Sequence, residues 1–195
     1  MNNTGGTENT ATGAQALLLN TNGNYNTATG DQAMQFNTAG NNNTAIGEVA
    51  LLMNTKGDSN TAAEDGALAG NTTGDSNAAV RDSALLSNTA GRDDTATGSS
   101  ALKNSTGSND IGIGHEAGVN LTTGDNNIDI FDPGVTGESN TIRIGTQGTQ
   151  TDTYIAGIFG TPKIKKACEV VVESTGLLRC VKSSARYKRD IPRYG

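Results

Sequence analysis

A repeat of 17 residues dominates this chain and restricts the folds open to it. Units with the pattern Asn-Thr-Ala-x-Gly start at intervals of 17 residues, at Asn9, Asn26, Asn43, Asn60, Asn77 and Asp94. A seventh unit starts one residue early, at Asp110, and an eighth starts at Asn127. Later in most units an Ala-Leu pair (Ala33-Met34 in the second unit), an Asn-Thr pair and a closing Gly recur. A fixed period indicates a stacked repeat architecture, because disordered polar chains have none.

The length of the period favours a parallel β-solenoid over a helical repeat. Helical repeats need about 33–47 residues per unit, and Asn, Thr and Gly are poor helix formers. Each unit has room for two short strands, Thr-Ala-x and Ala-Leu-x-x, joined by turns at its Gly, Asn and Asp positions. Stacking at about 4.8 Å would turn the columns into Asn ladders and apolar stripes. The sequence therefore predicts an all-β solenoid of about seven 17-residue coils.

The composition predicts that one chain alone buries too little. Hydrophobic residues make up 33% of the sequence, with no Trp and three Phe, whereas ordinary domains are about 45–50% apolar. Ordering each residue costs about 1–2 kcal/mol. We therefore expect a homotrimer with a shared interior, formed by the outer pairs Leu17/Leu19, Met34/Phe36 and Leu51/Met53.

The unit also resembles a known family of fibre repeats. The pattern N-T-A-x-G-x-x-A-L-x-x-N-T-x-G, from Asn9 to about Gly124, is similar to the head repeats of YadA-type trimeric autotransporter adhesins. It resembles still more the longer repeats of tail-fibre and surface-fibre proteins of phages, large viruses and bacteria. The resemblance implies homotrimers of left-handed parallel β-rolls. The chain departs from the pattern where Glu64 and Arg81 replace a turn Gly, and we expect a surface ion pair between them.

The repeat weakens towards the C-terminus, which suggests four segments. Residues 1–126 are the solenoid; 127–160 hold degenerate repeats and a β-rich cap of the trimer; 161–182 form a β-hairpin lead-in; 183–195 begin another domain. Residues 151–160 alternate polar and apolar side chains, as strands do. The hairpin would bring Cys168 and Cys180 close together, either as a disulfide or as two small buried side chains.

The last segment carries the only candidate catalytic pair. Ser183-Ser-Ala-Arg-Tyr-Lys-Arg-Asp-Ile191 resembles the start of the endosialidase-type intramolecular chaperone domain, which assembles a trimeric fibre and then cleaves itself off. The resemblance implies a cut beside Ser183, with Lys188 as the assisting base, since a Ser hydroxyl needs a nearby base. Because the chain stops at Gly195, before the body of such a domain, we expect no self-cleavage and no enzyme activity.

Other polar residues give no clear site. Asp58, Asp75, Asp93 and Asp125 recur after the closing Gly and could form a carboxylate row for a divalent cation, although such residues more often cap turns. His115 is the single histidine and is expected at the surface. Two Cys and one His are too few for a four-ligand zinc site in one chain. We therefore predict no metal and no cofactor.

Charge and hydropathy exclude two classes of partner. The net charge is −6, and the basic residues concentrated in 161–195 lack a recognisable nucleic-acid-binding motif, so no nucleic acid partner is predicted. No run of about 18 apolar residues exists, so no membrane insertion is predicted. The first residues have no basic patch and no apolar stretch, unlike a secretory signal.

Three functions remain open from the sequence. The first is a structural or adhesive fibre segment outside the cell, on a virion tail fibre or a microbial surface, which spaces or presents a surface for a glycan or protein receptor. The alternative is an enzyme fragment, either a self-processing tailspike or a polysaccharide-degrading fibre. The third is an ice- or lattice-binding solenoid. For that function the Thr pairs would share one flat face, interrupted by Ile, Ala and Val: Thr10/Thr12, Thr27/Thr29, Thr44/Ile46, Thr61/Ala63, Ala78/Val80 and Thr95/Thr97.

Overall fold

The computed structural model describes residues 3–154, 169–172 and 178–181. The chain divides into two units, Met1–Thr146 and Gln147–Gly195. Within the described residues all regular structure is β-strand and no helix occurs. The all-β prediction is therefore confirmed.

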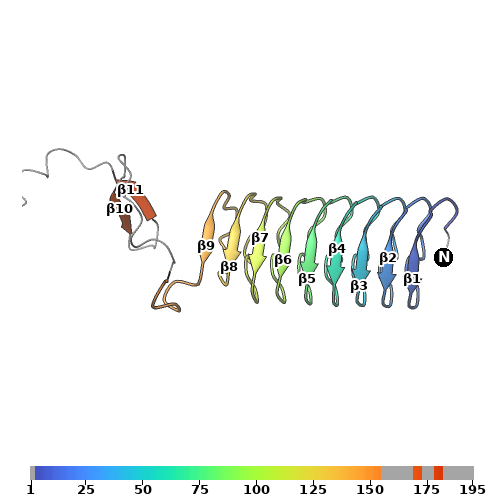
Figure 1. The fold of residues 1–195 in the computed structure, drawn as a ribbon, viewed down its shortest axis with the longest axis horizontal. Coiled ribbons are helices and arrows are strands. Elements are labelled where there is room, and N and C mark those ends of the chain that lie inside the picture. Colours follow the sequence, from blue (N-terminus) through green and yellow to red (C-terminus); the bar gives the residue numbers. More distant parts are fainter. Residues whose placement is uncertain (1–2, 155–168, 173–177, 182–195) are drawn as a thin grey trace, which may run out of the picture. The chain divides into compact units, whose positions relative to one another are not determined.

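The first unit is a parallel β-solenoid in which each strand pairs with the next one along the chain (Figure 1). Successive strands begin 17 residues apart from β1 to β6, and then 16, 17 and 14 residues apart. The stack has about eight turns and extends to Ile144, within the segment interpreted as degenerate repeats. The nine strands are β1 (Thr10–Thr12), β2 (Thr27–Thr29), β3 (Thr44–Ile46), β4 (Thr61–Ala63), β5 (Ala78–Val80), β6 (Thr95–Thr97), β7 (Ile111–Ile113), β8 (Ile128–Ile130) and β9 (Ile142–Ile144).

Each coil contains one strand, not the two that the sequence suggested. The Thr-Ala-x segment forms the strand, and its middle residue is buried in β2 to β8. The Ala-Leu-x-x segment is a pair of tight turns instead. Its backbone closes on itself from Leu18 N to Gln15 O at 3.2 Å, and alternate residues still bond the next coil, as from Leu17 N to Ala33 O at 3.0 Å. The second predicted strand is wrong because the Leu position has φ near +50°, for example 50° at Leu51.

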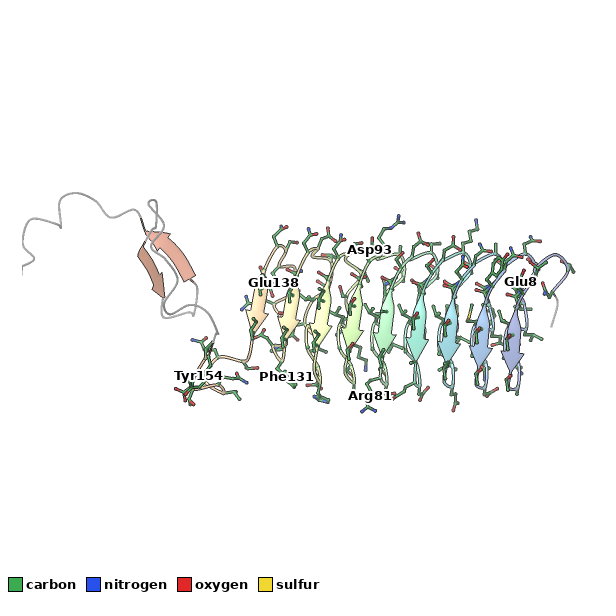
Figure 2. All side chains as sticks on the ribbon, in the orientation of Figure 1. Glu8, Arg81, Asp93, Phe131, Glu138 and Tyr154 are labelled. Carbon is green, nitrogen blue, oxygen red and sulfur yellow. The ribbon has the colours of Figure 1, made fainter. Side chains whose placement is uncertain are left out.

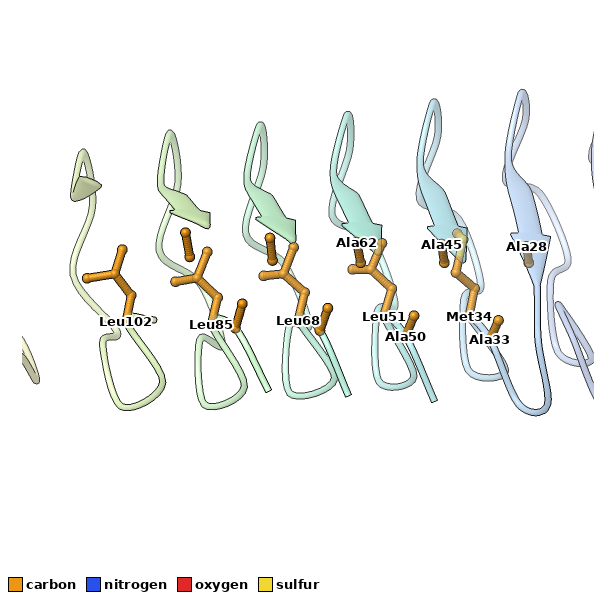
Figure 3. Packing of buried hydrophobic residues seen from close by; sticks show 14 of the residues in the cluster. Ala28, Ala33, Met34, Ala45, Ala50, Leu51, Ala62, Leu68, Leu85 and Leu102 are labelled. Atoms are coloured by element: carbon orange, nitrogen blue, oxygen red, sulfur yellow. The ribbon is translucent and has the colours of Figure 1, made fainter. Parts of the chain in front are cut away.

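This left-handed turn directs the Leu column into the coil. The Ala of the strand and the Ala-Leu pair of the turn stack as apolar columns in the interior (Figure 3). Leu17, Met34 and Leu51 are completely buried within their own chain, so the prediction that they are outer residues shared between chains is wrong. A left-handed conformation costs an L-residue about 1–2 kcal/mol. Full burial of a Leu or Met side chain contributes about 1.5–3 kcal/mol, which offsets that cost.

Two ladders of buried Asn side chains run beside the apolar columns, as the repeat predicts. In the first ladder the Asn Oδ1 accepts the backbone N–H of the same position one coil later, as from Asn60 N to Asn43 Oδ1 at 2.8 Å. In the second ladder side chains bond each other, as from Asn54 Nδ2 to Asn37 Oδ1 at 2.8 Å. Members of both ladders are almost fully buried, and each such amide needs its partners because an unpaired buried amide costs about 1–3 kcal/mol.

The two ladders meet at the closing Gly of each coil. The carbonyl of Gly57 accepts the side-chain amides of Asn43, at 2.8 Å, and Asn54, at 3.0 Å. The same double contact recurs at Gly40 and Gly74. The closing Gly therefore has the same surroundings in these coils, and neighbouring atoms leave no room there for a side chain.

The second unit contains a two-stranded sheet. The strands β10 (Glu169–Val172) and β11 (Leu178–Val181) pair antiparallel, in the segment interpreted as a β-hairpin. Cys180 lies opposite Val170 in this register. Cys168 lies outside the described residues, so the two alternatives for the cysteines both stay predictions.

Candidate binding surface

The outward side of the nine-stranded sheet is uncharged at its strand positions. We call it the sheet face and define it by the first and third residues of β1 to β9. Thr fills both positions in β1, β2 and β6, and Ile fills both positions in β7, β8 and β9. No first or third residue of these strands carries a charge. The most exposed Ile side chains are Ile142, at 67%, and Ile144, at 72%.

Exposed charges lie in the turns at the two edges of the stack. In Figure 2 Arg81 and Phe131 project from one edge, and Glu8 and Asp93 project from the other. The solenoid thus separates its charged turns from a neutral strand surface. The fold explains this separation. Successive residues of a strand point alternately to the interior and to the sheet face, whereas residues in the turns project from the edges of the stack.

Glu64 and Arg81 form the ion pair that the sequence predicts. Arg81 Nη1 lies 3.0 Å from Glu64 Oε1, and both side chains are largely exposed. They replace turn glycines and adopt φ values of 83° and 102°, whereas Gly30 at the same place has 137°. An exposed ion pair contributes about 0–1 kcal/mol, less than the backbone strain of two non-Gly residues at positive φ.

We expect Glu64→Gly to stabilise the protein by about 1 kcal/mol. The substitution removes backbone strain of about 1–3 kcal/mol and loses an exposed ion pair of about 0–1 kcal/mol. Chemical unfolding followed by circular dichroism measures the difference. Glu48→Gly, at an exposed turn position without positive φ, is the matched control and should not stabilise. A loss of stability in Glu64→Gly would contradict the strain assigned to this turn.

Three of the four aspartates expected in one row do lie in one. Asp58, Asp75 and Asp125 occupy a column in which a side-chain oxygen accepts a backbone N–H of the preceding coil, as from Asp58 N to Asp75 Oδ1 at 2.9 Å. Asp93 is not part of it, because it lies at the next position, with φ of 60°. Arg92 and Ser108 occupy the row between Asp75 and Asp125. Among the described residues no group of three or more His, Cys, Asp and Glu could hold a metal ion.

Two buried acids replace Asn in the first ladder. Asp94 and Asp110 are almost completely buried, and each still accepts the backbone N–H of the next coil, as from Asp110 N to Asp94 Oδ1 at 2.9 Å. Asp110 Oδ2 accepts the hydroxyl of Ser105 at 3.0 Å, but Asp94 Oδ2 has no partner. The Asn-to-Asp changes are visible in the repeat, although their burial could not be known without the coil geometry.

Asp94 Oδ2 takes the place of an amide donor. Asp94 Oδ2 lies 3.0 Å from the point where a Cβ on Gly91 would stand. In the preceding coil Asn77 Nδ2 lies 3.0 Å from the point where a Cβ on Gly74 would stand, so the two atoms occupy equivalent places. Asn77 Nδ2 donates to the Gly91 carbonyl at 2.8 Å. Burial raises the pKa of Asp94 to about 7; the backbone N–H of Asp110 acts in the opposite direction, and the negative charges of Asp110 and other acids add to the rise. A proton on Oδ2 would restore the missing donor.

The core changes character in the last coils. Asp129 takes the Ala position of β8, is 1% exposed and has no partner for Oδ2; burial raises its pKa to about 7. Arg143 lies opposite Asp129 in the strand register and donates three hydrogen bonds to the Glu138 carboxylate, the shortest at 2.7 Å. That pair lowers the pKa of Glu138. The described part of the stack thus ends on charged side chains instead of Ala and Leu.

The remaining candidate residues form no site among the residues that the structure describes. Ser183 and Lys188 lie outside the described residues, so the catalytic pair stays a prediction. His115 is exposed, 3.9 Å from the carboxylate of Glu116. No helix long and apolar enough to span a bilayer occurs in the described part of the chain.

Comparisons with protein-family models, with curated proteins and with solved structures found no match to this chain. The chain can therefore be classified by its fold alone. It is a parallel β-solenoid with one strand in each coil and a neutral sheet face.

Proposed function

We propose that this chain is a segment of a homotrimeric fibre, structural or adhesive, which spaces or presents a receptor-binding surface outside the cell. The fibre belongs to a phage or virus tail or to a microbial surface, and its receptor is a cell-surface glycan or protein. In this proposal the coils are left-handed, and residues 127–160 cap one end of the trimer.

The regular stack supports a spacing role. Backbone bonds and buried side-chain ladders link each coil to the next, and nine strands at about 4.8 Å give a length of about 40 Å. Each coil contacts only its neighbours, so adding coils lengthens the structure without altering its cross-section.

The neutral sheet face is the observation that carries the proposal of a trimer. The chain holds 34 charged residues, and none of them stands at the first or third position of β1 to β9. A surface kept free of charge over nine consecutive strands suits close contact with another protein surface, since no charge has to leave water.

Light scattering coupled to size-exclusion chromatography tests the assembly. The trimer predicts a mass of about 60 kDa, three times the 19.9 kDa chain. A mass near that of a single chain at all concentrations would refute it. A glycan array then tests the role: binding without turnover supports an adhesive fibre, whereas turnover would favour the alternative of a polysaccharide-degrading fibre. A mass spectrum showing a species that ends near Ser183 would favour the other alternative, a self-processing tailspike.

One observation keeps the lattice-binding alternative open. The Thr pairs of β1, β2 and β6 do lie on the sheet face, with the third residue of each strand exposed. The array is interrupted by Ile46, Ala63 and Val80, which a regular ice-matching surface would not contain. An ice-recrystallisation assay separates this function from the fibre, because a fibre segment should leave ice growth unchanged.

A further inference from the structure

We propose that the isoleucine end of the sheet face binds two further copies of this chain, an inference that rests on the trimer proposed above. The isoleucine end is defined by both outward residues of β7, β8 and β9: Ile111, Ile113, Ile128, Ile130, Ile142 and Ile144. The proposal goes further than the trimer itself, because it assigns the apolar part of the contact to one end of one face.

The first argument is the cost of leaving these side chains in water. A sheet surface that faces solvent normally carries polar residues, as the Thr pairs of β1 and β2 do. Ile142 and Ile144 are about two-thirds exposed or more and Ile113 is 39% exposed, whereas the other three Ile of this end are half-buried. Burial of each such side chain contributes up to about 1.5–3 kcal/mol. Six neighbouring Ile side chains that stay partly or largely in water are typical of an interaction site.

The second argument, from charge, favours another copy over a charged partner. A partner attracted by charge would find no charged group at the outward positions of β7 to β9. A second copy presents the same neutral positions, so that the two faces meet without burying any charge.

The third argument is geometric. Parallel, in-register strands arrange the Ile side chains as two ridges with a spacing of about 4.8 Å along the stack. A second copy has ridges of the same spacing, which can interdigitate in the manner of stacked sheets. An unrelated partner would have to match this spacing by chance.

The area of the face argues for three copies instead of two. Nine strands of about 4.8 Å spacing and about 10 Å width give a face of about 400 Å². Two such faces would bury about 800 Å² in total, the level of crystal-packing contacts, whereas a trimer would bury all three faces, about 1,200 Å² summed over its three contacts. The Ile end supplies the apolar part of this contact, and the Thr end adds area with little apolar burial.

The Thr pairs of β1 and β2 show which residues can replace the Ile pairs in a test variant. The variant I128T/I130T/I142T/I144T places at β8 and β9 the same residues that β1 and β2 carry at these positions, so the coils should still form. We expect sedimentation equilibrium to show trimer dissociation constants at least 100-fold weaker than in the wild type, with an unchanged circular dichroism spectrum. I144K alone, at the most exposed of the six, should give the same direction of change.

Val135→Thr is the matched control, because Val135 is exposed but lies outside the strands. It should leave the association unchanged. A wild-type trimer that persists with equal strength in both Ile variants would overturn the inference and leave the proposed fibre intact. A single chain in the wild type at every concentration would overturn both, and an equal loss in the Val135 control would show that the contact is not at the sheet face.

Discussion

Gly57→Ala should destabilise the solenoid by about 3 kcal/mol or more. An added Cβ would lie against the carbonyl oxygen of Gly74 in the next coil and 2.5 Å from Asn54 Oδ1. Neither atom can move away cheaply. The first belongs to the backbone of the stack, and the second to a buried Asn ladder in which Asn71 Nδ2 donates to Asn54 Oδ1 at 2.9 Å. Overpacking at a rigid site costs about 1–3 kcal/mol, and loss of a buried amide contact adds about 1–3 kcal/mol.

Urea unfolding followed by circular dichroism measures this effect. Lys56→Ala, an exposed substitution at the preceding residue of the same turn, is the control and should change stability by less than about 0.5 kcal/mol. Equal stability of the two variants would mean that the coils are farther apart than the stacked ladders require.

The second large effect concerns pH. We expect the stability of the wild type to depend on pH, and Asp94→Asn should remove part of that dependence. Burial raises the folded-state pKa of Asp94 from 3.8 to about 7. Between these values the folded protein holds a proton that the unfolded chain releases, so stability falls as the pH rises from about 4 to about 7 and is level above that. A shift of about three units corresponds to about 4 kcal/mol.

Asp94→Asn should therefore match the wild type at pH 4 and exceed its stability by about 4 kcal/mol at pH 8. The amide can donate to the Gly107 carbonyl, as Asn77 does to Gly91 at 2.8 Å, and its Oδ1 can still accept the N–H of Asp110. Thermal unfolding of both proteins across this pH range gives the difference directly. Asn60→Asp is the inverse variant and should introduce a pH dependence of the same sign in an intact coil. A difference between wild type and Asp94→Asn that is constant with pH would contradict the prediction.

Much of the fold follows from the repeat alone. The column of Ala11, Ala28 and Ala45 marks the inward residue of each strand, and the in-register strand pairs reproduce it. The Asn columns predicted ladders that the hydrogen bonds confirm. The ion pair of Glu64 and Arg81 also follows, since residues 17 positions apart must be neighbours along the stack. In each case the reason is the same: corresponding positions of successive repeats lie side by side along the stack.

The path of the chain within one coil could not be predicted in the same way. The Leu column has the composition of a strand, yet Leu51 and Leu68 have φ near +50° and turn inward. This conformation is unfavourable for Leu by itself and is stabilised only by the cavity that neighbouring coils create. The candidate surface was missed for the same reason, because the Ile pairs of β7 to β9 could equally have faced a core.

By itself the sequence determined the period, the parallel stacking and the identity of neighbours along the stack, because a repeated unit leaves few other ways to pair its columns. Only the tertiary structure decided that the Leu column also turns inward, so that a single chain already buries its Leu side chains, and which face stays neutral and open. Which side chains face the interior depends on how each coil closes. That closure uses turns with positive φ at the Leu and Met positions, a conformation that these residues do not prefer by themselves.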